Sequence, residues 1–320
     1  MNLASNYPLL AREPENETNY GFSYQGMWFD QHNLHIFAGL NAVDNPHNVE
    51  LTFKALQQHG LTCARMGVFK PRTSPYNFQG LGVTCLPYVL ELAATYGIKI
   101  IALEITHESQ LDVINNLLAQ QNNPTKILVQ IGTRNAQNFE LLKAVGKQQE
   151  FAILYKRGYG ISLEESIAAC EYLAYAGNSK IIFCLRGMKS QFATPHRNFV
   201  DFAHVPVIKR LTKMPVCIDP SHAVGNLAAN IDHISDIFHT TAQGVIAGAN
   251  MLLVDMHPEP HKALVDAKQA LSLAQLEWFL EDVKLCRSVY LRRIAMAEQS
   301  KSDINSGHRT ISKDIANLIF

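Results

Sequence analysis

The feature that most constrains the fold is an alternation of short apolar runs with longer runs of helical spacing, which recurs eight times. The apolar runs are rich in β-branched residues and end in polar turns, a pattern typical of buried strands. Strands that alternate with helices lie parallel and are joined by right-handed crossovers. Eight such units close into a barrel more readily than they form an open sheet. The sequence therefore predicts an α/β protein with a (β/α)8 TIM barrel.

The expected strands are residues 34–40, 63–69, 98–105, 126–131, 151–155, 180–185, 215–218 and 250–255. The expected helices are residues 46–59, 86–96, 109–120, 135–145, 163–176, 206–211, 232–247 and 271–296. No glycine-rich dinucleotide motif follows the first strand, and the chain contains no P-loop. Both absences count against a nucleotide-binding sheet.

Two segments flank the barrel, which we expect to span residues 34–298. Residues 1–33 form an N-terminal extension, and its aromatic-rich part, 20–28, is expected to form a hairpin that plugs the lower end of the barrel. Residues 299–320 form a C-terminal tail. Because apolar chain ends rarely stay exposed, we expect residues 315–320 to pack on the barrel or on a neighbouring subunit.

Composition excludes several classes of protein. Lysine plus arginine equals aspartate plus glutamate at 28 each, so no bulk charge attracts nucleic acid or an acidic membrane. Residues 1–20 are polar and lack the apolar core of a signal peptide, and no apolar run approaches the ~20 residues of a membrane span. The six cysteines show no paired metal-ligand spacing and are expected to be buried, reduced thiols. We therefore expect a cytoplasmic protein without nucleic-acid or membrane partners.

Polar residues crowd the ends of four expected strands, each time just before an expected helix. The carboxyl ends of the strands in such a barrel face one mouth, so these residues should meet in a single site. Arginine, lysine and histidine are prominent among them, and these side chains bind anions. The sequence therefore predicts an enzyme that acts on a small anionic substrate. The four stretches are KPRTS at 70–74, QIGTRN at 130–135, DPSH at 219–222 and HPEP at 257–260.

Several motifs together carry a resemblance to a known family. They are FKPRTSPY at 69–76 with FQGLG at 78–82, QNFELLK at 137–143, KRG at 156–158, DPSHA at 219–223 and HPEP at 257–260. From residue 34 to about 270 the sequence resembles the type I 3-deoxy-7-phosphoheptulonate (DAHP) synthases, particularly their short bacterial and archaeal branch. The resemblance implies an aldol-type condensation of phosphoenolpyruvate with erythrose 4-phosphate. The products are 3-deoxy-D-arabino-heptulosonate 7-phosphate and phosphate, at the entry to the shikimate pathway of aromatic amino acid biosynthesis.

The resemblance also implies which side chains bind the substrates. Those that hold phosphoenolpyruvate are Arg65, Lys70, Arg134, Lys156 and Arg186. A phosphate and a carboxylate in one cleft need several cations, and guanidinium groups bind both in bidentate fashion. Arg72, Thr73 and Ser74 correspond to the site for the acceptor's phosphate. Related eight-carbon sugar-acid synthases have a different sequence after the lysine, so this run favours a four-carbon phosphorylated aldose.

Three residues are expected to take part in the chemistry itself. Lys156 is the expected proton donor to the aldehyde oxygen, and Glu104 corresponds to a glutamate near the reacting carbon. Glu104 either orients the water that attacks C2 or pairs with one of the arginines, and the sequence leaves both open. His222 is expected to act in acid–base chemistry or as a metal ligand.

The resemblance breaks down at the metal site. The family draws its ligands from a cysteine, a histidine, a glutamate and an aspartate, and here the positions hold Asn41, His222, Asp255 and Asp266. Loss of the thiolate removes a charged, soft ligand, and the remaining set suits Mn²⁺ or Mg²⁺ better than Zn²⁺. The eight-carbon synthases include a metal-free branch with asparagine at this position. Three interpretations follow: a weak hard-ion site, metal-free catalysis, or a site that has lost activity.

Two further functions compete with DAHP synthesis. One is a paralogue that condenses phosphoenolpyruvate with a different aldose in specialised metabolism, and the other is a non-catalytic homologue that binds phosphometabolites.

Apolar surface in residues 20–28, in the last helix and at 318–320 favours a homodimer or homotetramer. The 33 residues before the first strand are too few for a folded regulatory domain. We therefore expect no inhibition by aromatic amino acids through an N-terminal module.

Overall fold

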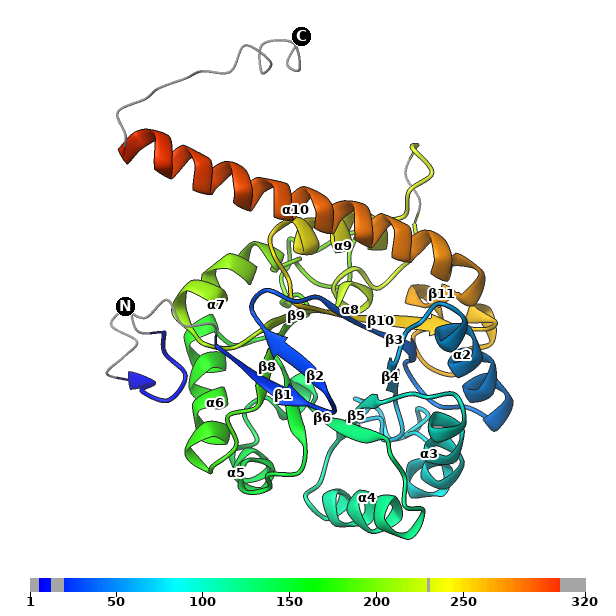
Figure 1. Ribbon diagram of the computed structural model, residues 1–320. Helices are drawn as coiled ribbons and strands as arrows, with labels where there is room; N and C mark the ends of the chain where they lie inside the picture. Colours follow the sequence, from blue (N-terminus) through cyan, green and yellow to red (C-terminus); the bar gives the residue numbers. More distant parts are fainter. Residues whose placement is uncertain (1–5, 13–19, 229–230, 306–320) are drawn as a thin grey trace.

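Eight parallel strands close into a barrel in the computed structural model, which describes residues 6–12, 20–228 and 231–305 (Figure 1). Each strand pairs with the next in chain order, and the last pairs with the first, which closes the barrel. The predicted (β/α)8 fold is therefore confirmed. The strands are β3 (His35–Leu40), β4 (Cys63–Met66), β5 (Ile100–Ile105), β6 (Lys126–Ile131), β7 (Ala152–Lys156), β8 (Ile181–Leu185), β9 (Val216–Ile218) and β10 (Met251–His257).

Helices form a ring outside the barrel and cover its apolar outer face. The ring consists of α2 (Pro46–Gln58), α3 (Leu86–Thr95), α4 (Ser109–Gln120), α5 (Phe139–Lys147), α6 (Leu163–Tyr175), α7 (Val205–Leu211), α9 (Asp236–Ile246) and α10 (Leu276–Asn305). Shorter elements lie in the loops: α8 (Pro220–Val224), β11 (Leu271–Ser272), and the 3-10 turns η1 (Gly82–Cys85), η2 (Thr133–Asn135), η3 (Phe202–His204), η4 (Pro260–Lys262), η5 (Ala267–Gln269) and η6 (Leu273–Gln275). None of the helices among the described residues is both long and apolar enough to cross a membrane.

Side-chain hydrogen bonds explain where two helices begin. The sequence predicts a helix at 135–145, but α5 starts at Phe139 because the Asn138 side chain accepts a hydrogen bond from the Leu141 amide at 3.2 Å. Ser162 and Glu165 form a reciprocal capping box at the start of α6.

A hairpin covers the amino ends of the barrel strands. Strands β1 (Gly21–Tyr24) and β2 (Met27–Asp30) pair antiparallel, and the hairpin lies across the barrel in Figure 1. Tyr24 and Phe29 are buried in the same cluster as inward-facing side chains of the barrel such as Leu128. The Tyr24 hydroxyl donates a hydrogen bond of 2.5 Å to the carbonyl of Ile127, near the start of β6. The hairpin thus covers the end of the barrel that lies away from the polar motifs.

We expect Phe29→Ala to lower the free energy of unfolding by about 3–5 kcal/mol, the usual cost of removing a fully buried aromatic ring. Phe29 is 2% exposed and its ring centroid lies 5.5 Å from that of Phe22 and 6.5 Å from that of Phe37. Urea unfolding measures the change. Trp28→Ala, at a neighbouring position that is 44% exposed, is the control and should cost much less. Equal losses for the two variants would contradict a packed hairpin.

The last helix is longer than the sequence predicts. Helix α10 continues past residue 296 to Asn305, because this stretch contains good helix formers such as alanine, glutamate, glutamine and lysine. It therefore runs across residue 298, where we expected the barrel domain to end. The apolar end at 315–320 lies outside the described residues, so its expected packing stays a prediction.

Candidate active site

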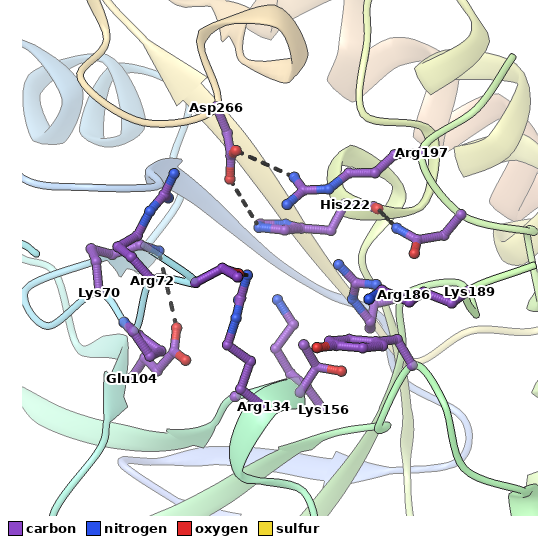
Figure 2. Close-up of a pocket in the computed structure, with 16 residues that line it drawn as sticks. Lys70, Arg72, Glu104, Arg134, Lys156, Arg186, Lys189, Arg197, His222 and Asp266 are labelled. Atoms are coloured by element: carbon purple, nitrogen blue, oxygen red, sulfur yellow. Dashed lines mark hydrogen bonds and ion pairs between the residues drawn. The ribbon is translucent and has the colours of Figure 1, made fainter. Parts of the chain in front are cut away.

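A cavity of about 200 Å³ opens at the carboxyl ends of the barrel strands (Figure 2). It is lined by more cationic side chains than anionic ones, with His222 at one wall. The carboxylates in the lining are Glu104 and Asp266. The cations are Lys70, Arg72, Arg134, Lys156, Arg186, Lys189 and Arg197. Such an excess of positive charge in a small cleft calls for a ligand with several negative charges.

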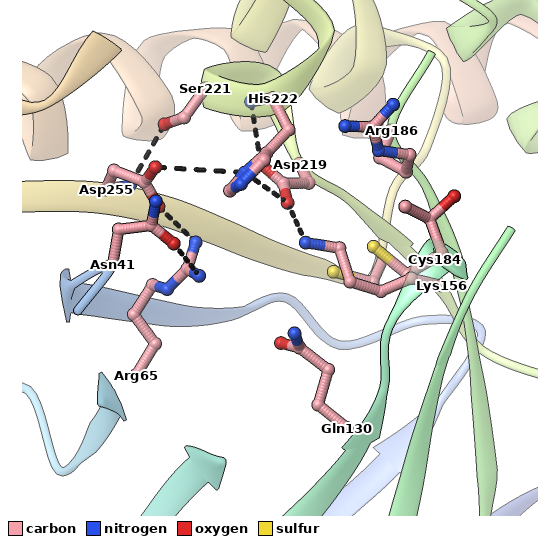
Figure 3. Close-up of polar contacts among 12 residues, drawn as sticks. Asn41, Arg65, Gln130, Lys156, Cys184, Arg186, Asp219, Ser221, His222 and Asp255 are labelled. Atoms are coloured by element: carbon pink, nitrogen blue, oxygen red, sulfur yellow. Dashed lines mark hydrogen bonds and ion pairs between the residues drawn. The ribbon is translucent and has the colours of Figure 1, made fainter. Parts of the chain in front are cut away.

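Lys156 lies at the centre of the site. It is the last residue of β7, is 4% exposed, and its Nζ forms an ion pair with the Asp219 carboxylate (Figure 3). Asp219 is fully buried after β9 and caps the short helix α8, where its Oδ1 accepts a hydrogen bond from the His222 amide at 3.0 Å. The motif at 219–222 thus supplies an acceptor that holds the ammonium group in place.

Arg186 is a buried cation of the site that has an unpaired side-chain nitrogen. It directly follows β8, is 3% exposed, and its Nε has no hydrogen-bond partner among the described residues. Its Nη1 donates a long hydrogen bond of 3.4 Å to the carbonyl of Gly187. Burial lowers the pKa of Arg186, although the nearby carboxylates of Asp219 and Asp201 act in the opposite direction. An anionic ligand would supply the missing partner.

A second group of cations lies across the cavity. In Figure 2, Arg72 and Arg186 lie at opposite sides of the view, with Lys156 between them. Arg134, on η2, donates a hydrogen bond of 3.4 Å to the Thr73 hydroxyl. The cavity therefore offers two separated places for anionic groups, which suits either one substrate with two charges or two charged substrates.

Glu104 is held between a lysine and an amide. Its Oε2 lies 4.0 Å from Lys70 Nζ and accepts a hydrogen bond of 3.3 Å from Gln130. The ion pair is thus formed with a lysine rather than with an arginine. Burial lowers the pKa of Lys70 to about 8. Gly132 leaves room for the carboxylate, since a Cβ at that position would lie 1.8 Å from Glu104 Oε1.

His222 faces three carboxylates. Its Nδ1 lies 3.0 Å from Asp219 Oδ2 and 3.7 Å from Asp255 Oδ2, and its Nε2 lies 3.6 Å from Asp266 Oδ2. Burial lowers the pKa of His222 to about 4 despite these neighbours, so the imidazole is neutral at pH 7. Burial raises the pKa of Asp266, but the proximity of His222 and Arg197 outweighs it and lowers that pKa to about 2. Asp266 is therefore ionised at pH 7.

The residues at the family's metal position make hydrogen bonds with cationic groups instead. Asn41 Oδ1 accepts a hydrogen bond of 2.9 Å from Arg65 (Figure 3). It accepts another of 2.9 Å from Lys70, and Asn41 Nδ2 donates one of 2.8 Å to Asp266. Asp255 accepts hydrogen bonds from the Arg65 guanidinium and, at 2.6 Å, from Gln269.

This arrangement does not favour tight binding of a divalent ion. Two cationic groups already lie against the Asn41 oxygen, and one of them also holds Asp255, so a bound ion would be repelled at both positions. Within the described part of the chain, no three histidine, cysteine or carboxylate side chains are arranged to hold a metal.

The structure brings most of the expected site residues to the cavity wall. Arg65 and Asp255 lie below it, buried at 3% and 0% exposure, and Ser74 lies outside its lining. Sequence reasoning missed four residues that line the cavity: Tyr159, Lys189, Arg197 and Asn198. The only sequence signal for these residues was their position in the polar loops after two strands, β7 for Tyr159 and β8 for the other three. Asp219 was visible in a motif but had no role assigned.

The fold and the site together define the class of protein. It is a (β/α)8-barrel enzyme that acts on polyanionic substrates, which bind in a cation-lined cavity at the carboxyl ends of the strands. The model of the DAHP synthetase I family matches residues 21–290, and the chain belongs to this family. It is 36% identical to the phospho-2-dehydro-3-deoxyheptonate aldolase of Thermotoga maritima over 78% of this chain and 68% of that protein. It is 26% identical to a 2-dehydro-3-deoxyphosphooctonate aldolase of Aliivibrio fischeri over 78% of this chain and 87% of that one.

Solved structures agree with this assignment. The crystal structure of the Thermotoga maritima DAHP synthase superimposes with a TM-score of 0.76 at 32% identity, over 88% of this chain and 77% of that one. A truncated form of 3-deoxy-D-arabino-heptulosonate 7-phosphate synthase from the same organism gives a TM-score of 0.73 at 30% identity, over 89% of this chain and 98% of that one.

Proposed function

We propose that this protein condenses phosphoenolpyruvate with erythrose 4-phosphate to give 3-deoxy-D-arabino-heptulosonate 7-phosphate and phosphate, the first step of the shikimate pathway. Family membership and the name of the Thermotoga relative support the reaction. The observation that carries the proposal is the cavity itself, in which the Nε of the buried Arg186 has no hydrogen-bond partner among the described residues, beside Lys156 and Arg134. A substrate with a phosphate and a carboxylate supplies such partners.

In this proposal phosphoenolpyruvate lies over the centre of the cavity. Lys70, Arg134, Lys156 and Arg186 contact its anionic groups, and Arg65 supports them from below through Asn41. Neutralising the phosphate makes it a better leaving group, and holding the enol phosphate rigidly aligns C3 with the acceptor.

The chemistry has three parts. The C3 carbon of phosphoenolpyruvate attacks the aldehyde carbon, and Lys156 donates a proton to the aldehyde oxygen as it gains negative charge. Water adds at C2, oriented by Glu104 and by the neutral His222. Phosphate then leaves with cleavage of the C–O bond at C2. Because the donor atoms at Asn41 and Asp255 are already bound to cationic side chains, no step is assigned to a metal.

The acceptor is proposed to extend toward Arg72 and Thr73, with its phosphate between them and Arg134. Ser74 belongs to the same loop and is proposed to act through the loop's conformation, since it lies outside the lining of the cavity.

Phosphate release tests the proposal and separates its rivals. Purified protein is given phosphoenolpyruvate with erythrose 4-phosphate, with other phosphorylated aldoses, or with no acceptor, and the product is identified by mass spectrometry. Release with erythrose 4-phosphate alone supports DAHP synthesis. Release only with another aldose identifies a paralogue with a different acceptor. Binding of phosphoenolpyruvate without release in any mixture identifies a non-catalytic binding protein.

We expect activity to survive treatment with a chelator or to depend on a readily exchanged hard ion such as Mn²⁺, because Asn41 supplies a neutral oxygen where the family has a thiolate. Metal analysis after dialysis should find less than one tightly bound ion per chain. Asn41→Cys combined with Asp255→Glu should raise the affinity for first-row metals, and Asn41→Ala is the control without a ligand. Zinc or iron that stays bound in the wild-type protein through Asn41 would show this prediction to be wrong.

We further propose that the protein is a homodimer or homotetramer that uses α10. This helix extends beyond the barrel in Figure 1, and Leu285, Leu291 and Met296 are 63%, 52% and 59% exposed along it. Light scattering should therefore give two or four times the chain mass of 35.7 kDa. Leu285→Glu with Leu291→Glu should shift the mass toward that of one chain, while Glu298→Ala should not. A wild-type mass of one chain at micromolar concentration would contradict the proposal.

A cytoplasmic location is also proposed. All six cysteines are free and buried, which is typical of proteins from reducing compartments.

A further inference from the structure

Behind the cavity wall lies a buried ion pair that the proposed mechanism does not use. Arg157 and Asp201 are 2% and 3% exposed, and Arg157 Nη1 lies 3.0 Å from Asp201 Oδ2. Arg157 follows Lys156 at the end of β7. Asp201 precedes η3, at the far end of the loop that Arg186 begins. Neither member of the pair lines the cavity, so neither touches a substrate there.

Asp201 holds the backbone just after Arg186. Its Oδ1 accepts a hydrogen bond of 2.8 Å from the amide of Gly187. Gly187 has a φ of +83° and packs so closely that a Cβ would lie 2.7 Å from the Cβ of Asn198, so the chain turns sharply here. The direction of the Arg186 side chain therefore depends on a turn that the Asp201 carboxylate fixes.

Arg157 is bound to the neighbouring strand and loop through its backbone rather than its side chain. Its amide donates a hydrogen bond of 2.9 Å to the carbonyl of Cys184 on β8. Its carbonyl accepts a hydrogen bond of 2.8 Å from the Thr133 hydroxyl, and Thr133 directly precedes Arg134. Because successive residues at a strand end point to opposite sides, Lys156 faces the cavity while Arg157 faces Asp201. The Arg157 side chain thus starts from a backbone position fixed beside Lys156 and the residue before Arg134, and its partner Asp201 binds the backbone after Arg186.

Stability alone does not account for this pair. Transfer of two charges out of water costs several kcal/mol per ion, and apolar replacements of buried pairs are often neutral or stabilising. The Arg157 Nε has no hydrogen-bond partner among the described residues. The Nη1 that pairs with Asp201 also lies 3.0 Å from the Nδ1 of His204. What the pair does supply is fixed geometry, since the planar guanidinium accepts few orientations.

We propose that Arg157 and Asp201 are positioning residues that set Lys156 and Arg186 at the spacing and direction that phosphoenolpyruvate requires. This inference rests on the proposed function. The effect falls mainly on phosphoenolpyruvate, because Lys156 and Arg186 are proposed to bind that substrate, whereas Arg72 and Thr73 lie on the loop after β4. Loss of the pair therefore weakens phosphoenolpyruvate binding more than it weakens binding of the acceptor.

The first experiment compares three variants with the wild-type enzyme by calorimetric titration of phosphoenolpyruvate and by steady-state kinetics. Asp201→Ala should raise the Kd for phosphoenolpyruvate by about 100-fold, the effect of misplacing a binding group by about 1 Å, with the KM for erythrose 4-phosphate changed less than about threefold. Asp201→Asn keeps an oxygen for the Gly187 amide and should recover part of the loss. Asn178→Ala is the matched control: Asn178 is fully buried and donates two hydrogen bonds at the opposite end of β8.

Asn178→Ala should lower the thermal midpoint yet leave the Kd for phosphoenolpyruvate within about twofold. The double variant Arg157→Met with Asp201→Leu removes both charges and should restore the thermal midpoint without restoring the Kd. Wild-type affinity in Asp201→Ala or in the double variant would overturn the inference while the proposed function stands. An Asn178→Ala variant that binds as poorly as Asp201→Ala would also overturn it. A wild-type protein that fails to bind phosphoenolpyruvate would overturn the proposed function and this inference together.

Discussion

Lys156→Met should lower kcat by about 10²–10⁴-fold, the range that a positioned proton donor contributes. The substitution removes the ammonium group that lies against the Asp219 carboxylate at the centre of the cavity. Methionine is unbranched and only one heavy atom shorter than lysine, so the cavity largely retains its shape. Steady-state kinetics at saturating phosphoenolpyruvate measures the effect on kcat apart from binding.

Two observations are needed to interpret this result. Removal of one partner of a buried ion pair costs about 3–5 kcal/mol of stability, so the variant's folding must be checked by circular dichroism before kinetics. Lys143→Met is the control, because Lys143 pairs with Glu140 at 2.8 Å on the exposed face of α5, and its kcat should equal that of the wild type. A folded Lys156→Met enzyme with kcat within tenfold of wild type would remove Lys156 from the chemistry.

The sequence predicted the barrel well because its signals are local. β6 and α4 lie at the predicted residues, and the other barrel strands differ by a few residues at their ends. Apolar β-branched runs and the polar turns after them depend on near neighbours alone. The end of α10 was missed because nothing in a polar, helix-forming stretch marks where the helix stops.

The site was predicted less completely because its geometry joins loops that are far apart in the sequence. The motifs indicated Lys70, Arg134 and Lys156, but no motif placed Arg197, whose Nη1 lies 3.3 Å from Asp266 Oδ1. The sequence also showed that an asparagine replaces a thiolate at position 41. It did not show that Asn41 binds two cationic side chains, since those contacts arise only when β3 and β4 lie side by side.

One signal for Arg157 was present and was not used. The KRG motif contains two adjacent cations at a strand end, and the alternation of side chains along a strand sends only one of them into the barrel mouth. The other must lie behind the wall and needs a buried carboxylate there. Asp201 supplies it from 44 residues further along the chain, a distance over which the sequence gives no pairing rule.

Arg186→Met should weaken phosphoenolpyruvate binding and at the same time stabilise the free protein. Loss of a buried charged hydrogen-bond donor costs about 2–5 kcal/mol of binding free energy, or about 30- to 4000-fold in Kd. In the free protein Arg186 is 3% exposed, its Nε lacks a partner among the described residues, and burial lowers its pKa. Replacing this poorly compensated charge with an apolar side chain should raise the free energy of unfolding by about 1–2 kcal/mol.

The opposite signs of the two effects make this prediction specific. Arg157→Met is the matched comparison: it also removes a buried arginine, but it leaves the Asp201 carboxylate without its guanidinium, so it should destabilise the protein by about 3–5 kcal/mol. Urea unfolding without ligand gives the stability of each variant, and calorimetry gives the Kd. An Arg186→Met protein that is less stable than wild type, or that binds phosphoenolpyruvate equally well, would mean that Arg186 is a structural residue. A more stable protein that no longer binds would identify it as a group whose burial is compensated only by substrate.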